Sequence, residues 1–122
     1  MRLLATILVA YLTLSPVTTY AATWHVPAQC PTIQAGIDSA SAGDTVLVAA
    51  GTYTGEGNRD IDYLGKLIVV KSVTGDPSTC VIDCGEAARG FYFHWGEWPE
   101  AVLEGMTFTN GGAVSTPELF VP

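Results

Sequence analysis

Short apolar triplets recur along this chain at nearly constant intervals. They begin at Val46, Ile68 and Phe91, a period of about 22 residues that lies within the range of repeat architectures. A second apolar series, at 81–82 and 102–103, repeats at a similar spacing. In an extended strand the first and third residues of each triplet point to the same side. Each interval therefore accommodates two short strands joined by turns, with one side of each strand directed at a core.

Repeats of this length that contain only strands and turns are typical of a solenoid, in which like strands lie side by side in parallel. Val46, Ile68 and Phe91 are then expected to stack in one apolar column. A leucine-rich repeat has a similar length, but its regular leucine spacing is absent. A β-sandwich is the alternative. It would require tight hairpins, and Asn110-Gly111 is the one candidate turn, with no good strand after it.

Residues 31–40 have the apolar spacing of a short helix, with Ile33 and Ile37 on one face. The first coil of a solenoid exposes its apolar interior and a row of unpaired backbone groups. An amphipathic helix lying across that end would cover both. We expect Ile33 and Ile37 to face the first coil and Gln34 and Asp38 to face solvent.

Several of these segments resemble one known family. The sequences PTIQAGIDSA at 31–40, GDTVLV at 43–48 and GTY at 51–53 are similar to the opening of right-handed parallel β-helix proteins of the pectin-lyase-like superfamily. The segments 65–72, 81–85 and 105–111 look like the next coils, so the likeness spans most of the chain. It implies an all-β fold, a right-handed parallel β-helix (solenoid) of about three coils with a short N-terminal capping α-helix.

The resemblance is more specific for fold than for activity, because enzymes and non-enzymes share these opening coils. Pectin methylesterases carry G-x-Y-x-E; Gly51 and Tyr53 match it, but position 55 is Gly and the acid comes at Glu56. Family enzymes place their catalytic groups on central coils, and the paired-Asp, Gly-His-Gly and Arg-x-Lys motifs are missing here. We expect no catalytic residue, in a chain that resembles a truncated N-terminal fragment.

The segment 1–21 is typical of a secretory signal peptide. Arg2 precedes an apolar run of about a dozen residues, which is shorter than the roughly 20 that a membrane span needs. Cleavage after Ala21 places the small residue Thr19 three positions from the cut. We therefore expect a secreted, extracellular or periplasmic protein of bacterial type, with a cap at 22–44 and β-helix coils at 45–122.

The charge balance excludes several classes of partner. Five Lys and Arg against twelve Asp and Glu give a net charge of −7. A surface that binds nucleic-acid phosphates or an anionic membrane through basic residues is not expected, because such binding requires clustered positive charge. We expect no nucleic-acid partner, no membrane contact after signal cleavage, and a monomer in the full-length form.

Three cysteines leave two alternatives open. Cys80 and Cys84 are four residues apart in a stretch with strand character, so they are too distant to form a disulfide with each other. Cys30 could pair with either of them, or all three could be buried free thiols.

Two clusters of residues are candidates for binding. Trp95 and Trp98 lie in a Gly/Pro turn beside acids, and Tyr92 points outward next to them. Aromatic rings stack on the C–H faces of sugars while carboxylates accept hydrogen bonds from hydroxyl groups, so this turn is the best carbohydrate-binding candidate. His94, like His25, has no ligand partner at suitable spacing and is expected to be a surface residue.

Asn58, Asp60 and Asp62 alternate in one loop and could offer oxygen ligands to calcium, the only cofactor that the sequence suggests. The alternative is a polar turn in which Arg59 neutralises part of the charge. Asp83 and Glu104 could meet on neighbouring coils as a carboxylate pair, or form part of a solvated acidic stripe.

These observations favour a non-catalytic extracellular module with polysaccharide binding. The alternative is the N-terminal part of a polysaccharide-degrading enzyme of the pectate lyase, polygalacturonase or pectin esterase type whose catalytic coils are missing.

Overall fold

The computed structural model describes residue 16, residues 20–94 and residues 99–112. Most of the regular structure in this part of the chain is β. The elements are β1 (Thr23–Val26), α1 (Ile33–Ser39), β2 (Thr45–Val48), β3 (Gly51–Tyr53), β4 (Ile61–Asp62), β5 (Val69–Ser72), the 3-10 turn η1 (Pro77–Thr79), β6 (Cys80–Asp83), β7 (Phe91–Tyr92), β8 (Val102–Glu104) and β9 (Thr107–Thr109). Within the described ranges, no helix has the length and apolar character to cross a membrane.

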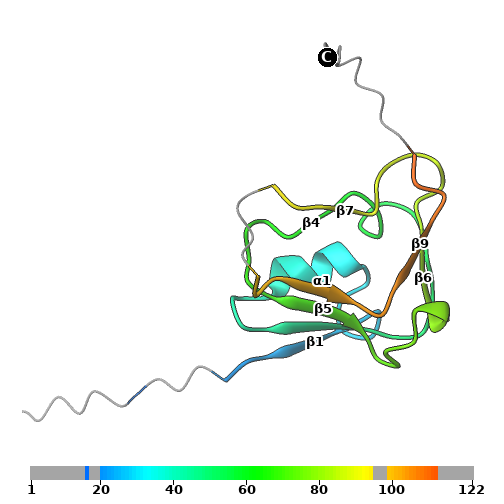
Figure 1. The fold of residues 1–122 in the computed structure, drawn as a ribbon. Coiled ribbons are helices and arrows are strands. Elements are labelled where there is room, and N and C mark those ends of the chain that lie inside the picture. Colours follow the sequence, from blue (N-terminus) through cyan, green and yellow to red (C-terminus); the bar gives the residue numbers. More distant parts are fainter. Residues whose placement is uncertain (1–15, 17–19, 95–98, 113–122) are drawn as a thin grey trace, which may run out of the picture.

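The strands form three parallel sheets. Their orders are β1-β2-β5-β8, β3-β6-β9 and β4-β7, and every pairing is parallel. From β2 onward, consecutive strands belong to the four-, three- and two-stranded sheets in turn. This order occurs first in β2, β3 and β4 and again in β5, β6 and β7. Figure 1 shows the three sheets around α1. The expectation of a mainly β chain with parallel pairing is confirmed.

The predicted column of Val46, Ile68 and Phe91 is wrong. Val46 pairs with Val70, which in turn pairs with Leu103, whereas Phe91 pairs with Ile61 in another sheet. The error arises because the connecting turns differ in length. The pairing of β2 with β5 begins at positions 45 and 69, whereas that of β5 with β8 begins at 69 and 102, so the second interval is clearly longer.

The alternation of buried and outward side chains is as expected. Val46 and Val48 are fully buried and Leu47 between them is half-buried. The same alternation holds in β6, where Cys80 and Ile82 are buried. These inward residues join those of the helix in one apolar core. Burying each such side chain stabilises the fold by about 1.5–3 kcal/mol.

The helix α1 packs as the sequence predicts, although it is shorter. Ile33 and Ile37 are fully buried, and α1 contacts β1, β2 and β4. It begins after Thr32, whose hydroxyl accepts a hydrogen bond from the Ala35 N–H at 3.1 Å. It ends before Ala40, where the backbone becomes extended. An oxygen-bearing N-cap of this kind satisfies one of the free N–H groups of the first turn.

The end of α1 is held by a lysine from the next part of the chain. The Lys66 ammonium donates hydrogen bonds to the carbonyl oxygens of Ile37 and Ala40, each at 2.7 Å, and of Asp38 at 3.1 Å. A positive charge at this position also complements the negative end of the helix dipole.

Replacing Lys66 with methionine should lower the free energy of unfolding by about 2 kcal/mol, because charge-assisted hydrogen bonds to three carbonyl groups are lost. Lys71→Met is the matched control. Lys71 lies on the outward side of β5, where a substitution is expected to change stability by less than about 0.5 kcal/mol. Urea unfolding of both variants measures the difference, and equal midpoints would contradict this role of Lys66.

All three cysteines are buried free thiols, so of the two sequence alternatives the structure has the one without a disulfide. Burial raises the pKa of the Cys80 and Cys84 thiols above the ordinary value. Of the predicted leader only residues 16, 20 and 21 lie within the described ranges. In the predicted cap, β1 pairs with β2 and thus belongs to the four-stranded sheet.

Candidate functional site

The outward side of the β4-β7 pair brings together five polar and aromatic side chains from two distant segments. Ile61 and Phe91 are register partners, and Asp62 pairs with Tyr92. The parallel pairing places Asp60 and Asp62 from one segment beside Arg89, Tyr92 and His94 from the other. We call these five residues the β4-β7 face.

Tyr92 lies at the centre of a stack. The Arg89 guanidinium carbon is 3.9 Å from the centroid of the Tyr92 ring. The His94 ring centroid is also 3.9 Å away, with an interplanar angle of 13°. Two groups this close to one ring centroid cannot share a face, so they cover opposite faces of Tyr92. The residue as a whole is still 36% exposed.

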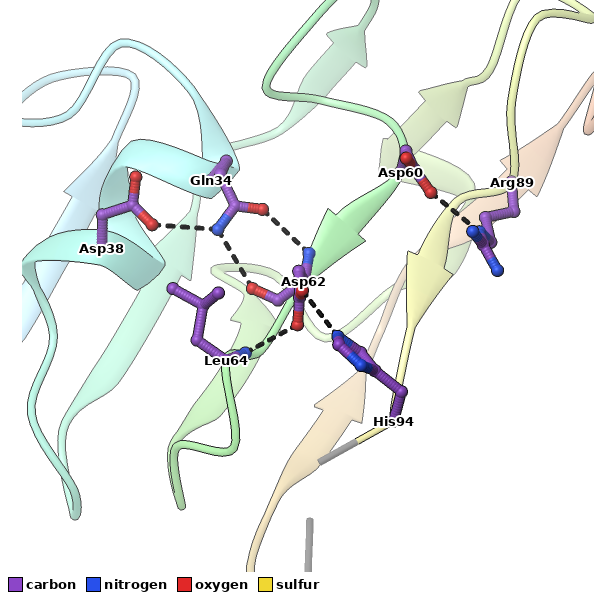
Figure 2. Close-up of polar contacts among 7 residues, drawn as sticks. All are labelled: Gln34, Asp38, Asp60, Asp62, Leu64, Arg89 and His94. Carbon is purple, nitrogen blue, oxygen red and sulfur yellow. Dashed lines mark hydrogen bonds and ion pairs between the residues drawn. The ribbon is translucent and has the colours of Figure 1, made fainter. Parts of the chain in front are cut away.

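Arg89 is fixed by a second contact. Its Nε donates to Asp60 Oδ1 at 2.7 Å (Figure 2), and both side chains are more than half exposed. The backbone repeats this connection, since the Asp60 N–H donates to the Arg89 carbonyl oxygen at 2.6 Å. A surface ion pair contributes little to stability, so its effect here is to hold the guanidinium in place.

Asp62 and His94 form a half-buried pair. His94 Nε2 lies 2.7 Å from Asp62 Oδ2, with side-chain exposures of 20% and 26%. The other carboxylate oxygen, Oδ1, accepts a hydrogen bond from the Leu64 N–H at 2.8 Å. Figure 2 shows both oxygens in use. The carboxylate therefore has a fixed orientation toward the imidazole ring.

A helix side chain fixes the backbone behind this pair. Gln34 Nε2 donates to the Asp62 carbonyl oxygen at 3.0 Å, and its Oε1 accepts from the Asp62 N–H at 2.8 Å (Figure 2). Gln34 thus occupies the edge of β4 as a neighbouring strand would. The prediction that Gln34 faces solvent is wrong, because its side-chain amide makes the two hydrogen bonds to the β4 backbone that a neighbouring strand would otherwise make. Asp38 is exposed as predicted.

The electrostatics of the face favour an ionised Asp62. Partial burial alone would raise the pKa of Asp62. The hydrogen bonds from His94 and the Leu64 N–H, together with the electrostatic attraction of His94 and Arg89, outweigh that effect, and the pKa of Asp62 lies below its ordinary value.

The sequence predictions for this site are met in part. Tyr92 points outward as expected, but both of its ring faces are already covered. Trp95 and Trp98 lie outside the described residues. The prediction that His94 is a plain surface residue is wrong, since it is half-buried against Asp62, while His25 is exposed. Sequence reasoning also missed Arg89, whose role depends on a strand pairing that the chain's own spacing does not reveal.

The side chains of the three calcium candidates do not converge on a common site. Asp60 and Asp62 bind Arg89 and His94, whereas Asn58 is buried beneath the helix. The Asn58 Oδ1 accepts from the Ile33 N–H, and its Nδ2 donates to the Thr54 carbonyl oxygen, each at 3.0 Å. In the described part of the chain, no group of three His, Cys, Asp or Glu side chains could hold a metal ion.

Replacing Asn58 with alanine should lower the free energy of unfolding by about 2 kcal/mol, because the buried Ile33 N–H loses its acceptor and the Thr54 carbonyl group loses its donor. Thermal or urea unfolding measures the loss, and adding calcium to the wild-type protein serves as the comparison. A calcium-dependent gain that the variant lacks would show that Asn58 acts as a ligand instead.

Of the two alternatives for Asp83 and Glu104, the carboxylate pair is excluded. Asp83 pairs in register with Thr109, while Glu104 lies opposite Lys71 in a different sheet. Asp83 instead accepts hydrogen bonds from the Asn110 amide at 3.0 Å and the Gly85 N–H at 2.9 Å. These bonds lower its pKa.

Stability should decrease in acid because four aspartates have a lowered pKa in the folded chain: Asp44, Asp62, Asp76 and Asp83. Each contributes stability above the unfolded-state pKa of about 3.9, and loses it as the pH falls through the lower folded-state pKa. The urea midpoint should therefore be steady from pH 7 to 5 and fall below about pH 4. Asp83→Asn should make that fall shallower. A midpoint that rises in acid would contradict these assignments.

A shallow pocket of about 370 Å³ adjoins the β4-β7 face. Its lining includes Asp60 together with Glu56, Arg59 and Ala88. The pocket therefore meets the β4-β7 face at Asp60. No family model, curated protein or solved structure matches this chain.

Proposed function

We propose that the chain forms the first coils of a right-handed parallel β-helix and acts as a non-catalytic extracellular module that binds polysaccharide through the β4-β7 face. The repeated order in which the chain visits the three sheets supports the β-helix. Right-handedness follows from the general rule for parallel crossover connections. The helix α1 then acts as the cap of the first coil.

The stack of Arg89, Tyr92 and His94 between two carboxylates carries the binding proposal. It offers fixed donors from the guanidinium, fixed acceptors from Asp60, and a hydroxyl from Tyr92 that can do both. Sugars are recognised by such groups, and groups that are already ordered lose little entropy on binding. Because the Tyr92 ring is covered on both faces, it would contact the sugar through its edge and hydroxyl. The segment with Trp95 and Trp98 follows directly and would supply the stacking ring.

Uncharged glycans suit this surface best. Within the face the charges of Asp60 and Arg89 offset each other, and the whole chain carries −7. A polyuronate would be repelled by that net charge. We therefore propose a neutral polysaccharide as the ligand class.

Titration with oligosaccharides tests this proposal. Chitin fragments and fully methyl-esterified pectin fragments should shift the tryptophan fluorescence of the wild-type protein, whereas polygalacturonate and alginate should not. Tyr92→Ala should weaken the binding by about tenfold or more, which corresponds to about 1.4 kcal/mol. Thr52→Ala, an exposed position on β3, is the matched control. Unchanged fluorescence with every glycan, or equal affinity of the Tyr92→Ala variant, would refute the proposal.

The second candidate function is part of a polysaccharide-degrading enzyme, and the oriented Asp62–His94 pair favours it. A carboxylate that orients an imidazole is a common arrangement in general acid–base catalysis. If this function holds, the chain within its longer protein should release new chain ends or methanol from pectin, and His94→Ala should abolish that activity. Activity that survives His94→Ala would remove the pair from the mechanism.

A further inference from the structure

Asp44 is a nearly buried carboxylate at the end of the molecule where β1 begins. It lies in the turn between α1 and β2 and is 7% exposed. Its Oδ1 accepts a hydrogen bond from the Ala22 N–H at 2.8 Å. Its Oδ2 accepts from the Ser41 N–H at 2.9 Å and from the Trp24 indole N–H at 3.1 Å. All three donors are neutral.

No basic side chain in the described part of the chain forms an ion pair with this carboxylate. Lys66 acts on Asp44 only through space, because its ammonium group is bound to the carbonyl oxygens of α1. A buried carboxylate without a direct counter-ion is costly. Asp44 therefore has capacity for a cation that the unprocessed chain does not supply.

The contact with Asp44 also marks where the chain joins the fold. Tyr20 is 86% exposed and Ala21 is exposed. Ala22 is the first described residue with a hydrogen bond to the rest of the protein, since its N–H binds Asp44 and its carbonyl oxygen accepts from the Thr45 N–H at 2.9 Å. The Ala21–Ala22 peptide bond thus lies at the boundary between exposed chain and the first sheet.

We propose that cleavage between Ala21 and Ala22 creates a new amino terminus that binds Asp44 as an ion pair. The cleavage rests on the signal peptide predicted from sequence. Water hydrolyses the peptide C–N bond in the active site of a leader peptidase. The carboxylate of Ala21 leaves with residues 1–21, and the freed amine of Ala22 takes up a proton.

Protonation changes the strength of the contact. An amide N–H is replaced by an ammonium group with a full charge, at an atom already 2.8 Å from the carboxylate. Charge-assisted hydrogen bonds are roughly twice as strong as neutral ones. The space beside Asp44 is already an open pocket of about 580 Å³. Tyr20 and Ala21 form part of its lining and leave with the leader, which leaves room to hydrate the other ammonium hydrogens. Removal of the leader therefore stabilises the first strand.

The ion pair has a defined pH window. A free α-amino group has a pKa of about 7.7–8.0, and pairing with Asp44 raises it. The added stability is complete below that ordinary value and is lost as the pH rises through the raised one. The hydrogen bond from the Ser41 N–H, followed by those from the Ala22 N–H and the Trp24 indole, lowers the pKa of Asp44. The contact is thus also lost in strong acid.

The experiment starts from the full chain expressed in a secreting bacterial host. Amino-terminal sequencing of the exported protein should give Ala22 as the first residue. NMR titration of its ¹⁵N-labelled amino group should then give a pKa above the ordinary range of about 7.7–8.0. Asp44→Asn should return this pKa to the ordinary range, whereas Asp38→Asn, at an exposed acid on α1, should leave it raised.

A second measurement covers the case in which Asp44→Asn does not fold. Acetylating the Ala22 amine of the exported protein removes the charge but keeps the N–H, so the acetylated protein should have a lower urea midpoint than the free amine at pH 6 and an equal one at pH 11. A different first residue, an unshifted amino pKa, or equal midpoints at pH 6 would overturn the proposal. These readouts do not depend on glycan binding.

Discussion

Replacing Tyr63 with alanine should lower the free energy of unfolding by about 4 kcal/mol, close to the whole stability of a small domain. Tyr63 directly follows β4 and is fully buried. Its ring centroid lies 5.8 Å from that of Phe91 and 4.7 Å from that of Phe93, and its hydroxyl donates to the Val102 carbonyl oxygen at 2.6 Å. One side chain therefore joins the two-stranded sheet to the four-stranded one, and its removal leaves a cavity between them.

Tyr63→Phe separates the two contributions. It keeps the ring contacts but leaves the Val102 carbonyl group without its donor, which should cost about 1–3 kcal/mol. Urea unfolding of both variants, monitored by circular dichroism, measures whether Tyr63→Ala loses more stability than Tyr63→Phe. Burial also raises the pKa of the Tyr63 hydroxyl, so it should stay protonated at high pH until the protein unfolds. An alanine variant within about 1 kcal/mol of the wild type would mean that Tyr63 does not join the sheets.

Replacing Gly57 with alanine should cost about 3 kcal/mol, although it adds a single methyl group. Gly57 has φ +82°, and an added Cβ would lie 2.6–2.9 Å from three side-chain atoms of Thr32, the N-cap of α1. Left-handed backbone costs a non-glycine residue roughly 1–2 kcal/mol, and overpacking typically adds about 1–3 kcal/mol. The displaced loop also carries the Gly57 carbonyl group that accepts from the Gln34 N–H at 2.9 Å.

Gly43→Ala is the matched control for this effect. Gly43 has φ +90°, but an added Cβ there meets nothing within 4 Å. It should therefore show only the backbone cost, about 1–2 kcal/mol. Chemical denaturation of the two variants gives the difference directly. If the Gly57→Ala and Gly43→Ala variants lose the same stability, the close approach of the Gly57 backbone to Thr32 does not help to hold α1 in place.

The elements that the sequence predicts best are those with buried, periodic side chains. Ile33 and Ile37 are one helical turn apart and both fully buried, and Val46 and Val48 show the two-residue alternation of a strand. Such patterns are local, because burial of one face repeats at the period of the element itself.

Register could not be predicted in the same way. Turns of unequal length separate the paired strands, so the assumption of a constant period aligned Val46 with Ile68 instead of Val70. It also placed Phe91 in the wrong sheet. Strand β4 is only Ile61–Asp62, too short for any periodic signal, although it carries Asp62 of the candidate site.

The site depends on that unpredicted register. Asp62 and His94 are 32 residues apart in the sequence. Arg89 and Asp60, which form an ion pair, are 29 residues apart. Gln34 looked like a solvent-facing helix residue because its partner is a backbone segment that no side-chain pattern identifies. Tyr92 could be placed outward from alternation alone, but the groups that cover its ring could not.

The most direct test of the parallel three-sheet arrangement is a nuclear Overhauser map of the isotopically labelled protein. In-register parallel contacts are expected from Val46 to Val70 and from Val70 to Leu103, with a second set linking Tyr53, Ile82 and Phe108. Antiparallel strands would instead give close Hα–Hα contacts, because their non-hydrogen-bonded pairs bring Cα atoms to about 4.5 Å. Such contacts, or pairing of Val46 with Ile68, would contradict the arrangement on which the proposed site depends.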